Sequence, residues 1–143
     1  MRSAVRRLAT VAASLVLATV TTTVVTASPA AAATSGGWCN TASVTYSKKG
    51  DWISVPARIT RGTDTVLCTM GRGSYSGAVA QLQRTLNRCY GEHLKVDRAF
   101  GPKTKAALER AQRAHRIKRD GVYGPQSART LRHPAERGGC KPM

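Results

Sequence analysis

Two stretches of the sequence combine a carboxylate, an aromatic ring and a Gly-Pro pair in one order, 23 residues apart. They read DRAFGPKTKAAL from Asp97 and DGVYGPQSARTL from Asp120. An Asp side chain at such a place accepts backbone N–H groups two or more residues on, which holds a loop as an Asx-type turn. A Gly-Pro pair is typical of a helix start, because Gly tolerates a sharp N-cap backbone and Pro suits the first helical position. The repeat therefore predicts two loops of one design, each leading into a helix.

The remaining residues of the repeat fit the same design. Thr104 and Ser127 fall at the third helical position, where a hydroxyl group can reach back to the loop. Just before the caps, Phe100 and Tyr123 are expected to enter the interface between helices. The two helices would then join one core by the same local chemistry.

The residue types give little support to catalysis. The sequence shows no Ser–His–Asp order, no activated cysteine and no metal triad, and it has only seven acidic residues. His93, His115 and His133 are scattered without the spacing of metal ligands. We therefore expect a protein that is not an enzyme and that needs no metal or cofactor.

The N-terminus resembles an export signal. Three arginines precede a modestly apolar stretch, residues 8–25, and Ala31-x-Ala33 has the small-residue spacing that a signal peptidase reads. The Thr-rich second half of the stretch argues against a transmembrane helix. We predict a signal peptide at residues 1–33 and a secreted protein with no membrane span after cleavage; the Arg6-Arg7 pair leaves twin-arginine export open beside the general secretory route.

The four cysteines all lie after this signal. An even number in a small exported chain predicts two disulfides, for which three pairings exist. Cys39–Cys68 and Cys89–Cys140 are favoured, because each bond would close a loop within or around one structural unit. Such bonds stabilise a small domain that has little core.

The charge indicates polyanionic partners. The chain carries 23 Lys and Arg, and residues 34–143 keep 20 of them with all seven acidic residues, a net charge of +13. Outside a cell the available polyanions are cell-wall polymers, free carboxylates of wall peptides and anionic lipid. We expect no nucleic-acid partner.

Periodicity divides the rest of the chain near Gly71. Residues 34–70 form a short strand-rich extension of two or three strands with turns near Gly50 and Gly62, which we expect to pack against the helical remainder of the chain. Residues 71–143 contain three apolar-periodic segments, at 77–90 after an N-cap at Ser76, at 102–115 and at 125–131. The predicted fold class is mainly α: a compact three-helix bundle preceded by a β-hairpin-like, disulfide-stapled N-terminal segment.

The order of GAVAQLQRTLN, LKVDRAFGPKTKAALERAQ and DGVYGPQSARTL, from Ser76 to about Leu131, resembles the three-helix peptidoglycan-binding domain found beside many bacterial wall hydrolases. The stretch LNRCYG and the basic surface are similar to the small secreted single-domain forms. Three positions depart from the family. The first loop has Arg98 where Gly is usual, Ala111 stands where Phe is frequent, and Arg116-Ile117 replaces a Gly-Leu pair. If position 98 needs a positive φ, Arg strains it or the first loop differs.

The resemblance implies non-catalytic attachment to peptidoglycan or another anionic wall polymer by a secreted, cell-wall-associated monomer. It implies a ligand-binding site made of Tyr90, Arg98, Phe100, Asp120, Gly121 and Tyr123. The competing interpretation of these residues is structural, as loop caps and core plugs.

A different class of function shares the signal peptide, the disulfides and the charge: a secreted cationic effector, either an antimicrobial or a protease inhibitor. The predicted helices lack the broad apolar faces opposite Lys and Arg that membrane-active helices carry. An inhibitory loop would have to lie between Cys39 and Cys68.

Overall fold

The computed structural model describes residues 37–143, and the predicted signal peptide at residues 1–33 lies outside them. Within this region the N-terminal segment forms an antiparallel sheet in the order β1-β2-β3. Its strands are β1 (Thr41–Tyr46), β2 (Trp52–Thr60) and β3 (Thr63–Thr65). The predicted turns are present, with Gly50 and Gly62 at φ values of 79° and 80° that favour glycine.

Three helices come next, with nearly the predicted bounds: α1 (Gly77–Tyr90), α2 (Pro102–Ala114) and α3 (Pro125–Thr130). The Oγ atom of Ser76 accepts the N–H of Val79 and caps α1, as predicted. The helix ends at Gly91, whose left-handed backbone (φ 67°) closes the last turn.

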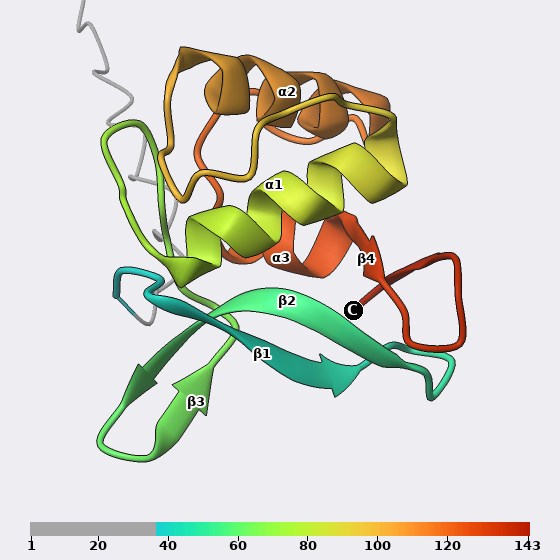
Figure 1. Cartoon of the computed structure of the whole chain (residues 1–143). Helices are drawn as coiled ribbons and strands as arrows, with labels where there is room; N and C mark the ends of the chain where they lie inside the picture. Colours follow the sequence, from blue (N-terminus) through green and yellow to red (C-terminus); the bar gives the residue numbers. More distant parts are fainter. Residues whose placement is uncertain (1–36) are drawn as a thin grey trace, which may run out of the picture. The chain divides into compact units, whose positions relative to one another are not determined.

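The prediction of a mainly α three-helix bundle is wrong. After α3 the chain forms a second sheet, in which β4 (Arg132–Pro134) pairs antiparallel with β5 (Cys140–Pro142). The third helix has only six residues, and α1 packs against β1, β2 and β4 as well as against α2 (Figure 1). The architecture is therefore mixed α and β. The second sheet was not predicted because strands of three residues show no period that a sequence can reveal.

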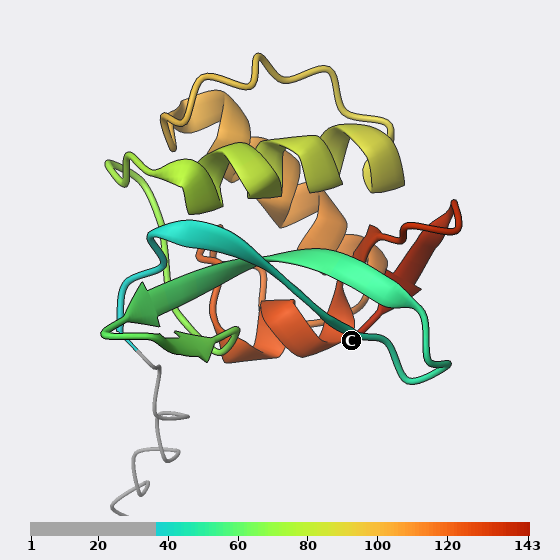
Figure 2. The same cartoon turned by 60° about the horizontal axis from the view of Figure 1, so that its bottom comes forward.

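The strand segment and the helices share one hydrophobic core. Cys39, Cys68 and Met70 are buried in the same cluster as the apolar faces of the helices. A smaller cluster lies on β2, where Ile53 and Val55 contact Ala135. Figure 2 shows the first sheet next to both α1 and α3. The extension is therefore an integral part of the fold around α1.

Two disulfides connect distant segments, and they have the pairing favoured from the sequence. Cys39–Cys68 joins the start of the sheet to the segment that leads into the helices. Cys89–Cys140 joins the last turn of α1 to β5 across 51 residues. The second bond holds the C-terminal sheet beside α1.

Candidate functional site

The two repeat loops have the same hydrogen bonds. The carboxylate of Asp97 accepts the N–H of Ala99 at 3.0 Å, and that of Asp120 accepts the N–H of Val122 at 2.9 Å. At both helix starts the third-position hydroxyl, on Thr104 or Ser127, donates back to the loop carbonyl five residues earlier at 3.4 Å. Gly101 and Gly124 are the N-caps, each followed by Pro, as predicted.

A buried glutamine from the preceding helix clamps each loop, and sequence reasoning missed it. The Nε2 group of Gln83 donates to the Asp97 carboxylate at 2.8 Å and to the Ala99 carbonyl at 3.1 Å. The Nε2 group of Gln112 makes the equivalent bonds in the second loop, and its Oε1 atom accepts the N–H of Gly121 at 3.0 Å. The only signal was a Gln-Arg pair in both helices, which the unequal distances to the two Asp residues concealed.

Hydrogen bonding keeps both aspartates ionised. The amide of Gln83 is the main cause that lowers the pKa of Asp97, followed by the Ala99 N–H. Burial raises the pKa of Asp120, but the N–H of Val122 and the side chains of Gln112 and Lys118 outweigh it, so this pKa is also lowered. These carboxylates are committed to the loops.

The backbone of the first loop has the same geometry as that of the second loop at the position in question. Arg98 has a φ of 68° and Gly121, its counterpart in the second loop, has a φ of 66°. The departure from glycine at position 98 therefore places an arginine in a left-handed conformation that costs a non-glycine residue about 1–2 kcal/mol. Arg116, the third departure, has a φ of 55° just after α2.

The six predicted ligand-binding residues do not lie together at one surface. Phe100 and Tyr123 are fully buried in the core, so neither ring presents a face to solvent. Gly121 is buried against α2, and Asp120 bonds its own loop. Arg98 is the one member of the six that is exposed. This arrangement agrees with the structural interpretation of the repeat, in which its residues shape the loops and fill the core.

Tyr90 also has structural partners. Its hydroxyl group accepts the N–H of Arg132 at 2.7 Å and bonds Nε2 of His115 at 2.9 Å. Burial raises the pKa of Tyr90 and lowers that of His115. The phenol thus ties the end of α1 to α2 and β4.

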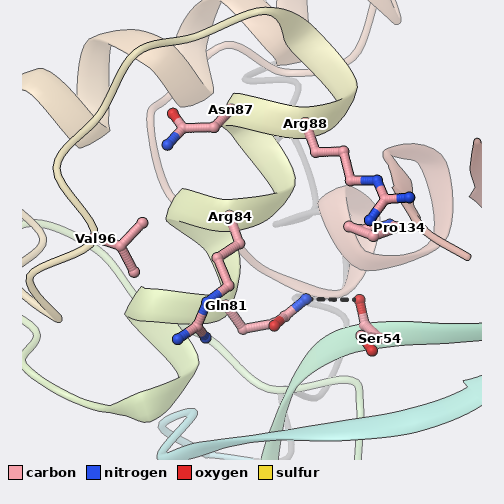
Figure 3. A pocket seen from close by; sticks show the side chains of 7 residues that line it. All are labelled: Ser54, Gln81, Arg84, Asn87, Arg88, Val96 and Pro134. Atoms are coloured by element: carbon pink, nitrogen blue, oxygen red, sulfur yellow. Dashed lines mark hydrogen bonds between the residues drawn. The ribbon is translucent and has the colours of Figure 1, made fainter. Parts of the chain in front are cut away.

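The most promising site is a groove of about 550 Å³ along α1, which we call the α1 groove (Figure 3). Its lining comes from four parts of the chain: Ser54 of β2, Gln81, Arg84, Asn87 and Arg88 of α1, Val96 of the following loop, and Pro134 of β4. None of these residues belongs to the predicted ligand-binding site of six residues. A volume of this size suits a small ligand or a short segment of a polymer.

The polar side chains of α1 build this groove from two sides. Gln81 is buried and donates to the Ser54 carbonyl at 3.1 Å, which fixes β2 to the helix. Asn87 bonds the backbone N–H and carbonyl of Leu94 at 2.7 and 2.8 Å, and so holds the loop that carries Val96. The groove walls are therefore preformed.

The charge in the groove is positive. Arg84 and Arg88 lie one helical turn apart on α1, both are exposed, and no acidic residue lines the groove. In contrast, Arg110 is neutralised by Glu92 through two bonds of 2.6 and 2.7 Å, and this guanidinium lowers the pKa of Glu92. Two guanidinium groups without carboxylate partners can bind a ligand carboxylate or phosphate through paired hydrogen bonds.

A second hollow, of about 370 Å³, lies at the N-terminus of α2 beside Lys95 and Lys103. A helix start favours anions. The ionised carboxylate of Asp97 lines the same hollow, however, and would repel them. We therefore take the α1 groove as the candidate site.

Residues 37–143 contain no cluster of three or more His, Cys, Asp or Glu side chains arranged to hold a metal ion. Among the helices of this part of the chain, none combines the length and apolar character needed to cross a bilayer.

The region of the two repeats is similar to known proteins. Over 59 residues the chain is 42% identical to the zinc D-Ala-D-Ala carboxypeptidase of Streptomyces albus G, a match that covers 40% of this chain and 23% of that protein. The chain thus spans less than a quarter of this relative. A solved structure of a peptidoglycan-binding protein from Clostridioides difficile, in complex with glutamine hydroxamate, is similar with 23% identity and a TM-score of 0.41, over 56% of this chain and 58% of that one. The family resemblance predicted from the sequence is confirmed by a family model, that of the putative peptidoglycan binding domain, which matches residues 75–131.

Proposed function

We propose that this chain is a secreted, non-catalytic protein that binds peptidoglycan at the cell wall, and that the α1 groove holds a carboxylate of the stem peptide. The observation that carries the proposal is the pair Arg84 and Arg88, which line a preformed groove whose described lining includes no acidic residue. The groove residues on α1 and Val96 fall inside the region that matches the peptidoglycan-binding family model.

The chemistry of the wall suits this groove. Stem peptides carry free carboxylates and amides, and the glycan carries hydroxyl groups. A guanidinium group binds a carboxylate through two parallel hydrogen bonds, while the amide of Asn87 and the carbonyl edge of Ser54 bracket the position. The half-exposed side chain of Val96 offers apolar contact for an alanine methyl group.

Attachment without catalysis is consistent with the same residues. The groove has no nucleophile paired with a base, and the ionised carboxylates nearby are occupied as loop caps or ion-pair partners. The repeat loops use their Asp, Gln and hydroxyl groups to position α2 and α3 rather than to contact a ligand. These features support the proposal of binding without bond cleavage.

The test is titration of the protein with soluble disaccharide–peptide fragments of peptidoglycan, followed by NMR. Residues 81–96 and Ser54 should show the largest shifts. The double variant Arg84→Gln/Arg88→Gln should bind at least about tenfold more weakly, because charge-assisted hydrogen bonds contribute more than neutral ones. The matched control, Lys103→Gln/Arg113→Gln, lowers the net charge equally on exposed positions of α2 and should bind normally. Equal weakening in both variants would show that only net charge matters and would overturn the α1 groove as the site.

A further inference from the structure

The β1–β2 hairpin, outside the region that matches the family model, carries two exposed aromatic rings on neighbouring positions. Tyr46 and Trp52 are partners in the strand register, and their ring centroids are 3.8 Å apart with a 33° tilt. The side chains remain 56% and 42% exposed. Val44, two residues before Tyr46 on β1, is also exposed. Adjoining exposed apolar side chains of this size mark a binding surface more often than a solvated one.

A strongly basic cleft lies at the turn that joins the two strands carrying these rings. The turn between Tyr46 and Trp52 carries Lys48 and Lys49, and these residues line a cleft of about 310 Å³ together with Arg132 and Lys141 of the C-terminal sheet. We call it the C-terminal basic cleft. Its nearest carboxylate, on Asp51, lies 3.8 Å from the Lys141 ammonium group and leaves three of the four cations without an acidic partner among the described residues.

The fold fixes both parts of this surface. The hydroxyl group of Ser47, which is buried, accepts the N–H groups of Lys49 and Asp51 at 3.3 and 3.0 Å and orders the turn. On the other side, the Cys89–Cys140 disulfide anchors β5, and the N–H of Glu136 donates to the Trp52 carbonyl at 3.0 Å. Figure 1 shows the β1–β2 turn beside the C-terminal segment. Rings and cations therefore keep a defined relation to one another.

We propose that the Tyr46–Trp52 pair and the C-terminal basic cleft together bind an anionic polysaccharide. Sugar rings of the polymer would lie with their C–H faces on the aromatic pair, and phosphate or carboxylate groups elsewhere on the same polymer would enter the cleft. The site is separate from the α1 groove, and the choice of a polysaccharide rests on the proposed wall setting. It gives the protein a second attachment point on the same material, which raises overall affinity without any new contact at the first.

Two other partners fit the surface less well. The tip of the hairpin is Lys48-Lys49-Gly50, so a membrane would have to take up two ammonium groups before it reached the rings. Rings whose centroids are 3.8 Å apart leave no gap for a nucleic-acid base between them. A base would have to stack on an outer ring face, and single-stranded DNA is therefore included in the test.

Four soluble polymers separate the contributions of ring and charge. Polygalacturonate and phosphorylated dextran carry sugar rings with carboxylate or phosphate, poly(glycerol phosphate) has charge without rings, and dextran has rings without charge. In calorimetry at about 0.15 M salt, polygalacturonate and phosphorylated dextran should both bind, and the one that binds more tightly identifies the preferred anion. Poly(glycerol phosphate) should bind about tenfold more weakly than phosphorylated dextran, because ring stacking is lost. Dextran should not bind.

Variants assign these effects to the hairpin. Tyr46→Thr/Trp52→Thr should weaken the two charged polysaccharides about tenfold and leave poly(glycerol phosphate) unchanged. Lys48→Gln/Lys49→Gln should weaken all three charged polymers about fivefold. The control Trp38→Thr/Tyr75→Thr removes two aromatic rings that are more exposed and lie elsewhere, and it should bind normally.

Three outcomes would overturn the inference: equal affinity for poly(glycerol phosphate) and phosphorylated dextran, affinity for single-stranded DNA or anionic vesicles at least as high as for the polysaccharides, or equal losses in the control variant. Every variant is first required to keep the thermal unfolding midpoint of the unmodified protein. Failure of fragment binding in the unmodified protein would instead contradict the α1 groove, so the two proposals fail separately.

Discussion

Exchanging glycine and non-glycine at the equivalent positions of the two repeat loops should change stability in opposite directions. Arg98 and Gly121 have φ values of 68° and 66°. A non-glycine residue loses about 1–2 kcal/mol in this conformation, whereas glycine costs about 0.5–1 kcal/mol in extra chain entropy of the unfolded state. Arg98→Gly should therefore raise the free energy of unfolding by about 0.5–1 kcal/mol. Arg98→Ala, which removes the same charge but keeps a Cβ atom, should give no such gain.

Gly121→Ala should lower the free energy of unfolding by about 2 kcal/mol, since it adds both the backbone cost and a contact. A Cβ atom at this position would lie 2.6 Å from Cγ of Lys105 and 3.0 Å from a carboxylate oxygen of Glu109, so the ion pair between these two side chains would have to move. Urea unfolding with intact disulfides, followed by tryptophan fluorescence, measures both changes as midpoint shifts at a constant m value. A destabilised Arg98→Gly or a neutral Gly121→Ala would refute the equivalence of the two loops.

Three further perturbations test the interior. Gln112→Leu leaves the buried N–H of Gly121 without its partner and removes the amide's bonds to Asp120 and Val122, which should cost about 2–4 kcal/mol in chemical denaturation; a loss below about 1 kcal/mol would contradict the clamp. Burial lowers the pKa of His133 to about 4, below its usual value of about 6.5. The unfolded state therefore takes up the proton first, and stability should fall by about 3 kcal/mol as the pH drops from about 6.5 to 4. His133→Gln should flatten this slope in thermal unfolding, and an unchanged slope would contradict the assignment. Replacing both Cys89 and Cys140 by Ser opens a loop across 51 residues and should cost about 4 kcal/mol, which calorimetry would show as a large drop in the unfolding temperature; a small drop would mean that the C-terminal sheet is held by other contacts.

The sequence predicted those features that depend on neighbouring residues. The Asx turns at Asp97 and Asp120, the Gly-Pro helix starts and the cap at Ser76 all depend on residue types within a few positions of one another, and the structure has each of them. The glutamine clamps were not predicted, because Gln83 and Gln112 lie at different sequence separations from the Asp residues that they bind.

The fold class and the α1 groove were not predicted, because both depend on long-range contacts that leave no local pattern in the sequence. The strands β4 and β5 are three residues each, and a disulfide to α1 holds them in place. The groove combines Ser54, α1, Val96 and Pro134, which are brought together by Gln81 and Asn87. The sequence assigned Phe100 and Tyr123 both to the interface between helices and to the ligand-binding site, and the structure buries both rings in the core, as the first of these assignments predicted.

The most direct test of the central claim, attachment to the wall without cleavage of it, is cosedimentation of the purified protein with insoluble peptidoglycan sacculi at about 0.05 and 0.5 M salt, on either side of physiological screening. The account predicts that the protein enters the pellet at both salt concentrations, that Arg84→Gln/Arg88→Gln shifts it toward the supernatant, and that no soluble fragments are released from the sacculi. Protein that remains in the supernatant at the higher salt concentration, or release of fragments during the incubation, would contradict it.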